Sequence, residues 1–308
     1  MEIINDIFIV ILSVVVISFG AMKLVDSAVR IAKKIGVSEL VIGLTIVAMG
    51  TSAPEFAVSI MSSFRDISDI SVGNIVGSNI FNLGFILGGT AIITSLSTNK
   101  KIVFRDGGFL LIGTILLTFF LWDLTLSRVE GAILFALLLI YLGVLFFKKE
   151  NIEYEDGANG YKWYDPLILL VSIILVVASS HYLVDSASSL ARIMGVSDWV
   201  IGATVVAAGT SAPELATSIV AALRSKYGIS VGNLIGSDIF NMYGVLGTSA
   251  LIRELPVDIE ARTNLILLIV MVLLTLIFMR TGWRVSRREG ILLILLGLGR
   301  WIYSFWLT

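Results

Sequence analysis

A six-residue segment with unusual chemistry for an apolar chain occurs twice in this sequence. It reads Gly-Thr-Ser-Ala-Pro-Glu at residues 50–55 and again at residues 209–214. A carboxylate at the centre of an apolar helix costs about 2–3 kcal/mol or more unless it is paired or faces a polar cavity. Each proline also removes a backbone donor, so the carbonyl group four residues earlier loses its helical partner. Carboxylate, hydroxyl and free carbonyl oxygens together form the environment that hard cations such as Ca²⁺ prefer.

A second duplicated element supplies more oxygen atoms. It reads Gly-Asn-x-x-Gly-Ser-x-Ile-Phe-Asn at residues 73–82 and 232–241. Its serine and last asparagine lie four residues apart and share one helical face, which holds for the pairs Ser78 with Asn82 and Ser237 with Asn241. The glycines have the spacing that lets membrane helices approach closely. We expect these faces to point at the two glutamates; the alternative interpretation is ordinary hydrogen bonding between helices.

One offset of 159 residues relates both elements. Residues 36–60 match residues 195–219 at 18 of 25 positions, and residues 70–82 match residues 229–241 at 10 of 13. The whole chain is therefore interpreted as two copies of one unit.

The same offset extends beyond the motifs. It pairs Asp26-Ser27-Ala28 with Asp185-Ser186-Ala187. The copies are expected at residues 1–149 and 165–308, joined by a short cytoplasmic loop at residues 150–164 that is rich in charge and glycine.

The composition indicates a membrane protein. Hydrophobic residues make up 57% of the chain and charged residues 15%, against about 25% charged residues in a soluble protein. Ten segments fit bilayer-spanning helices of about 20 residues each; they lie near residues 4–25, 37–64, 70–95, 104–122, 129–147, 165–184, 196–223, 229–252, 263–281 and 287–307. Five spans per copy is an odd number, so the second copy must enter the membrane from the opposite side. The expected fold is all-α: ten transmembrane helices in two inverted five-helix repeats, with helices 2 and 7 broken at the central ion site.

The positive charges predict an orientation. The loops after the odd-numbered spans carry fifteen Lys and Arg residues, whereas the alternate loops carry five: Arg65, Arg128, Arg192, Arg253 and Arg262. Because positive charge collects on the cytoplasmic side, both termini are expected outside the cell, in a multi-pass protein of the plasma membrane. Inverted repeats are typical of secondary transporters, whose sites lie near the membrane midplane.

Charge and cysteine content exclude several classes of protein. The net charge is −1 with no basic cluster, which speaks against nucleic-acid binding. The chain has no cysteine, so disulfides and thiolate chemistry are excluded. We expect no enzymatic activity, no cofactor and no protein partner; the expected partners are the lipid bilayer and transported ions.

These motifs resemble the two alpha-repeats of the sodium/calcium exchanger branch of the cation/calcium exchanger superfamily, and the resemblance covers the whole chain. The short connection between the copies resembles a minimal prokaryotic member. The resemblance implies an antiporter that exchanges Na⁺ for Ca²⁺ by alternating access, normally with net charge movement.

The resemblance also assigns roles to residues. Glu55 and Glu214 would bind Ca²⁺ directly, with further oxygens from Thr51 and Thr210. Flanking Na⁺ sites and the centre of the site would be formed by Ser52, Ser78, Ser211 and Ser237, the carbonyl groups of Ala48 and Ala207, and the side chains of Asn82 and Asn241. Two ionised glutamates neutralise one divalent cation or two monovalent ones, so competition between the two fillings produces exchange.

Asp238 departs from the pattern, because the first copy has Asn79 at the equivalent position. Asp238 lies about 100° around a helix from Ser237. We expect Asp238 and Asn79 to border the site without being ligands, and Asp238 to be protonated or hydrogen-bonded to a neighbouring helix.

Four alternatives stay open at this stage. A proton/calcium antiporter of the same superfamily typically has Gly-Asn-x-x-Glu repeats with a nearby histidine. A potassium-dependent sodium/calcium exchanger typically has aspartate at the position of Asn241. An intramembrane hydrolase with two carboxylates sharing a proton would need a Gly-x-Gly-Asp segment, which this chain lacks. A passive channel fits the inverted halves less well than a carrier does.

Overall fold

The computed structural model describes residues 2–65, 68–147, 160–195 and 207–306. Most of the expected connecting loop at 150–164, and the first part of the seventh expected span, lie outside these described residues. The boundaries assigned to the two copies therefore stay predictions.

The first copy contains the following elements: α1 (Glu2–Ile35), α2 (Glu39–Ile42), the π-helical segment η1 (Gly43–Val47), α3 (Ala48–Thr51), α4 (Ala53–Phe64), α5 (Ser68–Phe81), the π-helical η2 (Asn82–Leu87), α6 (Gly88–Ile93), strand β1 (Leu96–Ser97), the π-helical η3 (Lys101–Asp106), α7 (Gly107–Phe120), the 3₁₀ turn η4 (Leu121–Asp123), strand β2 (Thr125–Leu126) and α8 (Arg128–Phe147).

The second copy contains a matching series: α9 (Asp165–Ile193), α11 (Ala207–Gly209), α12 (Ala212–Leu223), α13 (Tyr227–Ile239), the π-helical η6 (Phe240–Leu246), α14 (Gly247–Ile252), strand β3 (Leu255–Pro256), α15 (Glu260–Arg280), the 3₁₀ turn η7 (Thr281–Trp283), strand β4 (Arg284–Val285) and α16 (Arg287–Trp306). The helical character expected from the sequence is confirmed.

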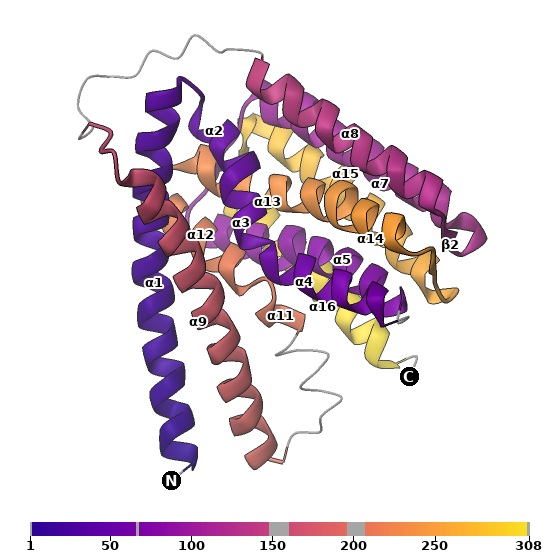
Figure 1. Ribbon diagram of the computed structural model, residues 1–308, viewed down its shortest axis with the longest axis horizontal. Coiled ribbons are helices and arrows are strands. Elements are labelled where there is room, and N and C mark those ends of the chain that lie inside the picture. Colours follow the sequence, from indigo (N-terminus) through magenta and orange to yellow (C-terminus); the bar gives the residue numbers. More distant parts are fainter. Residues whose placement is uncertain (1, 66–67, 148–159, 196–206, 307–308) are drawn as a thin grey trace.

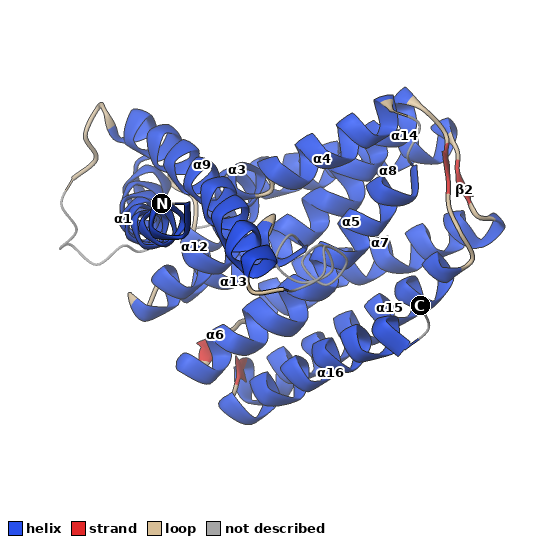
Figure 2. Ribbon diagram, turned by 90° about the horizontal axis from the view of Figure 1, so that it is seen from below, coloured by secondary structure: helices blue, strands red, loops and turns tan. Residues whose placement is uncertain are grey.

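The first helices of the two copies, α1 and α9, lie side by side and run in opposite directions (Figure 1). Seen from below, they stand to one side of the group formed by α4, α5, α7, α8, α14, α15 and α16 (Figure 2). Opposite directions are what inverted copies require of this helix pair.

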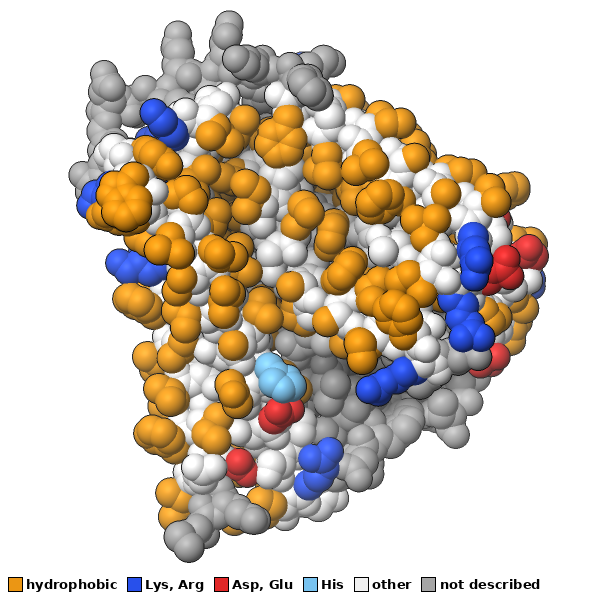
Figure 3. All heavy atoms as spheres, in the orientation of Figure 1, with side chains coloured by type: hydrophobic (Ala, Val, Ile, Leu, Met, Phe, Trp, Pro, Cys, Tyr) orange, Lys and Arg blue, Asp and Glu red, His pale blue; other side chains and the backbone are white. Residues whose placement is uncertain are grey.

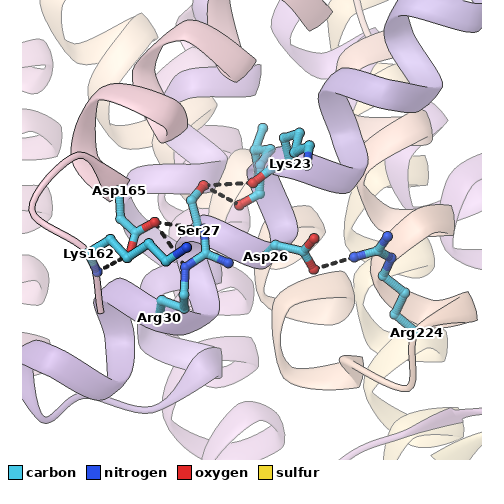
Figure 4. Close-up of polar contacts among 8 residues, drawn as sticks. Lys23, Asp26, Ser27, Arg30, Lys162, Asp165 and Arg224 are labelled. Carbon is cyan, nitrogen blue, oxygen red and sulfur yellow. Dashed lines mark hydrogen bonds and ion pairs between the residues drawn. The ribbon is translucent and has the colours of Figure 1, made fainter. Parts of the chain in front are cut away.

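Ion pairs tie this end of α1 to the second copy. The Arg30 guanidinium donates to Asp165 Oδ1 on α9 at 2.7 Å. Asp26 forms an ion pair with Arg224, which follows α12 (Figure 4). Lys226 lies 2.9 Å from Glu39 on α2. Three contacts between charged side chains therefore join the copies at one end of the molecule.

Six helices in the described part of the chain are long and apolar enough to cross a membrane: residues 3–35, 71–93, 101–123, 128–146, 165–193 and 260–283. Residues 39–51 and 53–64 form a bent pair of helices, and counting this pair as one span gives seven. Apolar side chains are spread over the face shown in Figure 3, while charged side chains lie mainly toward its edges and lower part. This is a helical membrane protein, while the full number of ten spans stays a prediction.

Four short strands were not foreseen by the all-α interpretation. Strand β1 pairs with β4 and β2 pairs with β3, each antiparallel and each over two residues. In both ladders one strand comes from each copy, so loops of the two halves are hydrogen-bonded to each other.

Helix α13 lies very close to the helix formed by α2 and η1. A Cβ atom built at Gly236 would come within 2.6 Å of the Leu44 Cα atom, and one built at Gly232 within 2.8 Å of the Leu40 carbonyl oxygen. Real Cβ contacts are not that short, so these positions need glycine. The small-residue spacing predicted to permit close approach is used here.

Candidate functional site

Each Gly-Thr-Ser-Ala-Pro-Glu segment breaks a helix at its serine. Ser52 has φ −79° and ψ 11° between α3 and α4, and Ser211 has φ −89° and ψ 9° between α11 and α12. Helix axes on the two sides of the first break differ by 50°. Both prolines lie in the first turn of the following helix, where the missing N–H has no intrahelical acceptor in any case.

The breaks place each glutamate in the first turn of a helix. Glu55 lies in the first turn of α4 and Glu214 in the first turn of α12. Unsatisfied N–H groups and the helix dipole favour negative charge there. Both side chains are buried, each with 1% exposure. The fold therefore holds two carboxyl groups inside the protein at positions suited to anions.

The two copies bind each other's glutamates through hydroxyl groups. The Ser52 hydroxyl donates to Glu214 Oε1 at 2.9 Å, and the Ser211 hydroxyl donates to Glu55 Oε1 at 3.0 Å. These contacts are equivalent under the 159-residue offset. Each glutamate is thus held by the broken helix of the opposite copy, and the two motifs form one site.

One oxygen of each glutamate is left available. Glu55 Oε2 and Glu214 Oε2 are buried and accept no hydrogen bond from the described residues. A buried carboxylate oxygen without a partner is costly, and a bound cation would remove that cost. These two atoms are the best candidates for direct contact with an ion.

Three further expected residues lie beside Glu214. The Ser237 hydroxyl is 3.4 Å from Glu214 Oε1 and 3.5 Å from the Ala48 carbonyl oxygen. Thr51 donates to that same carbonyl at 3.2 Å and lies 3.0 Å from Asn233 Oδ1. The structure therefore brings Ala48, Thr51 and Ser237 together with the carboxylate, as the interpretation of the sequence required.

The two central asparagines also face a shared interior. The Asn82 side chain donates to Asp238 Oδ1 at 3.0 Å, and the Asn241 side chain donates to Asn79 Oδ1 at 3.0 Å. All four side chains are buried. The Asp238 side chain is thus hydrogen-bonded to a neighbouring helix, since Asn82 lies at the junction of α5 and η2. Its protonation and its role stay predictions.

Asn82 and Asn241 both occupy π-helical segments. Such widened turns are rare and often occur at functional sites, because they rotate the side chains that follow. A third π-helical segment, η1, immediately precedes Ala48. Irregular helix geometry thus accompanies three of the proposed ligand positions.

The interpretation of the sequence missed a pair of supporting asparagines. Asn233 donates to the Glu214 carbonyl oxygen at 3.4 Å and to the Ser218 hydroxyl at 3.0 Å. Asn74 makes the equivalent contacts with Glu55, at 3.4 Å, and with Ser59, at 3.2 Å. Both asparagines and both serines are equivalent under the 159-residue offset, and that duplication was the signal that could have found them.

The other expected residues are placed with fewer contacts. Ser78 is buried on α5, Thr210 is half-buried at the second break, and Ala207 begins α11. Among the residues that the structure describes, no three acidic or histidine side chains converge as they would around a resident metal ion. The two glutamates are accompanied by neutral oxygen atoms, and the buried carboxyl group of Asp238 lies beside Asn82.

A cavity of about 650 Å³ lies beside the first broken helix. Its wall includes Pro54 and Thr210, the neighbours of Glu55 and Ser211, and the α9 residues His181, Asp185 and Arg192. The two glutamates are buried and do not line the cavity wall.

Comparison with known proteins agrees with this geometry. The model of the sodium/calcium exchanger protein family matches residues 6–147 and 164–303. The putative antiporter CaxA of Alkalimonas amylolytica is 34% identical over 304 residues, covering 94% of this chain and 95% of that protein. Sodium/calcium exchanger MaX1 of Methanosarcina acetivorans is 33% identical, covering 93% of this chain and 95% of that protein.

A solved structure has the same fold. The sodium-calcium exchanger NCX_Mj, soaked with zero Na⁺ and Ca²⁺, matches with a TM-score of 0.86 and 31% identity, covering 98% of this chain and 99% of that one. The fold is that of a helical membrane protein of the exchanger class. The chain belongs to the sodium/calcium exchanger protein family.

Proposed function

We propose that this protein is a secondary active antiporter that exchanges Na⁺ for Ca²⁺ across the plasma membrane. The observation that carries the proposal is the reciprocal pair of contacts between Ser52 and Glu214 and between Ser211 and Glu55. These contacts leave one buried oxygen of each glutamate free to meet a cation. Family membership and the match to NCX_Mj support the same function.

In this proposal Glu55 and Glu214 bind Ca²⁺ directly, and Thr51 and Thr210 add oxygen atoms. Na⁺ ions occupy flanking positions, and the centre is lined by asparagine; the residues concerned are Ser52, Ser78, Ser211, Ser237, the carbonyl groups of Ala48 and Ala207, and the side chains of Asn82 and Asn241. Two carboxylates balance one Ca²⁺, and removal of that ion leaves two negative charges that attract Na⁺. Ca²⁺ accepts six to eight oxygen ligands, which this many neutral oxygens can help to provide.

Alternating access would expose the site to one side of the membrane at a time. The cavity beside Thr210 and Pro54 would supply one route. The proposed arrangement has ten spans in two inverted repeats, with both termini outside the cell and residues 150–164 inside. With this orientation, the cavity opens to the extracellular side, because it is lined by the end of α9 that approaches the loop near Arg192.

Sidedness can be tested with single cysteines, since the chain has none. A cysteine at Asp123 should be labelled by an impermeant thiol reagent added to intact cells. A cysteine at Asn159 should be labelled only after the cells are opened. Labelling of the second position from outside would contradict the orientation.

The function is tested by reconstitution into proteoliposomes loaded with Na⁺ and diluted into Na⁺-free buffer that contains radioactive Ca²⁺. Uptake should require internal Na⁺ and should stop when an ionophore collapses the Na⁺ gradient. Repeating the assay with and without K⁺, and with a proton gradient in place of Na⁺, separates the rival exchangers. Uptake that is independent of every gradient would indicate a channel and contradict the proposal.

A further inference from the structure

The amide groups of Asn82 and Asn241 have a fixed orientation that the ion site alone does not explain. Each uses its nitrogen as a donor, Asn82 to Asp238 and Asn241 to Asn79, both at 3.0 Å. Each carbonyl oxygen, Oδ1, is buried and has no hydrogen-bond donor in the described part of the chain. Both side chains therefore offer an oxygen, and not an N–H group, to the interior.

This orientation matters because an asparagine side chain presents opposite chemistry at its two ends. A flipped amide would aim two N–H donors at the place where a cation binds. The same flip at Asn82 would put its Oδ1 against a carboxylate oxygen of Asp238, with no hydrogen between the two acceptors. A carboxylate partner thus selects one of the two orientations.

Two hydrogen bonds connect Asn241, through Asn79, to the backbone of Asp238. Asn79 donates through its own nitrogen to the Asp238 backbone carbonyl oxygen at 3.2 Å. That bond fixes the Asn79 amide so that its Oδ1 faces Asn241 and accepts from it. The Asp238 side chain therefore fixes Asn82, and the Asn79 side chain, held by the backbone carbonyl group of residue 238, fixes Asn241.

We propose that Asp238 and Asn79 are positioning residues that turn the carbonyl oxygens of Asn82 and Asn241, respectively, toward the transported ion. The inference rests on the proposed function, and it gives Asp238 a role that neither charge balance nor packing supplies. Support around a ligand is commonly as important as the ligand itself, and loss of such a partner costs about 10–100-fold in metal affinity in other proteins. The first copy has an amide, Asn79, at the equivalent position, so an amide oxygen can serve as the acceptor.

The test compares Asp238→Leu with Asp238→Asn in the Ca²⁺ uptake assay. Leucine has a similar size but cannot accept a hydrogen bond, so the KM for Ca²⁺ should rise about tenfold or more while uptake at saturating Ca²⁺ stays within a few-fold of wild type. Asparagine keeps an acceptor oxygen, so its KM should stay within about threefold of wild type. A residue that serves only folding would lower the amount of active protein and leave the KM unchanged.

Two results would overturn the inference. An unchanged KM in Asp238→Leu would mean that the orientation of Asn82 does not depend on Asp238. A large KM increase in Asp238→Asn, equal to that of Asp238→Leu, would mean that the carboxylate charge itself contacts the ion. Failure of wild type to take up Ca²⁺ would instead refute the proposed function, so the two failures are distinct.

A second measurement covers the case in which Asp238→Leu does not fold. Asn79→Leu removes the acceptor for Asn241 alone and leaves the carboxylate in place. The KM for Ca²⁺ should rise in this variant also, by a smaller factor because Asn82 keeps its partner. An unchanged KM in folded Asn79→Leu would contradict the connection through Asn241.

Discussion

The two copies share a sequence pattern but not an environment. Gly236 on α13 is packed against η1, where an added Cβ would lie 2.6 Å from the Leu44 Cα atom. Its counterpart Gly77 on α5 would meet only the Arg300 guanidinium among the described residues, at 3.8 Å. By the 159-residue offset, the segment equivalent to η1 is residues 202–206, which lie outside the described residues. The close packing of this motif is therefore described for the second copy alone.

Charged residues at equivalent positions of the two copies have different contacts. Asp26 and Arg224 form an ion pair across the copies. The 159-residue offset converts them into Asp185 and Arg65. Asp185 instead lines the cavity, with a 62% exposed side chain 3.3 Å from His181. The copies are thus joined by an ion pair at one end of the molecule, and the described residues lack the equivalent pair at the other end. The proposed alternating access would require an asymmetry of this kind.

Removing the charge of either glutamate should reduce Ca²⁺ uptake to a similar extent. Glu55→Gln and Glu214→Gln each remove half of the negative charge opposite a divalent ion, so we expect each to lower Ca²⁺ uptake at least about 100-fold. Thermal unfolding in detergent should show that both variants remain folded. If one variant transports Ca²⁺ like wild type, the two copies do not contribute equally and the site assignment is wrong.

Cross-linking should distinguish the end with the ion pair from the end without it. Cysteines at Asp26 and Arg224 should be joined readily in the absence of ions by a short bifunctional reagent that forms a disulfide with each thiol, and the joined protein should lose transport until a reductant cleaves these disulfides. Cysteines at Arg65 and Asp185 should be joined mainly during turnover, when the cavity closes. Equal yields for both pairs under all conditions would remove the proposed asymmetry.

Loss of the two supporting asparagines, Asn233 and Asn74, should raise the KM for Ca²⁺ by different factors. Asn233 is fully buried, whereas Asn74 is half-buried. Since removal of a buried hydrogen-bonding group costs about 1–3 kcal/mol, Asn233→Ala should raise the KM for Ca²⁺ about tenfold. Asn74→Ala should raise it only about two- to threefold, because water can replace the lost bonds. A larger KM increase in Asn74→Ala than in Asn233→Ala would contradict the argument from burial.

The glycines offer the smallest but most selective comparison. Gly236→Ala overpacks the contact with Leu44 and should reduce the free energy of unfolding by about 1–3 kcal/mol. Gly77→Ala meets only the Arg300 guanidinium among the described residues, so on those contacts alone it should leave stability unchanged or slightly raise it. Identical melting temperatures for the two variants would show that Gly77 is packed as closely as Gly236.

Much of the site could be predicted from sequence because the repeat fixes equivalent positions. The offset paired Glu55 with Glu214 and Ser52 with Ser211. It could not reveal that each serine binds the glutamate of the other copy, because that contact depends on how the halves are docked. The roles of the proposed ion ligands stay predictions.

The sequence did not predict the glycine packing, the short strands or the orientation of the Asn82 amide. The close contact of Gly236 with Leu44 depends on how α13 and η1 are docked, and the local sequence Gly-x-x-x-Gly-Ser is the same in both copies. Strands of two residues are too short to show the alternating pattern by which a strand is recognised. The orientation of Asn82 became visible only when its hydrogen-bond partner Asp238 was placed.

The two short ladders have a consequence for biosynthesis. Strand β1 can pair only after β4 has been synthesised, and β2 only after β3. Beside the first ladder the Thr98 hydroxyl donates to the Met279 carbonyl oxygen, 181 residues away. A ribosome adds about 5–20 residues per second, so the first copy stays in the membrane with unpaired strand edges for many seconds. The last folding step must come after α15 has been inserted, and a chain that stops before this point exposes the unfinished edges to quality control.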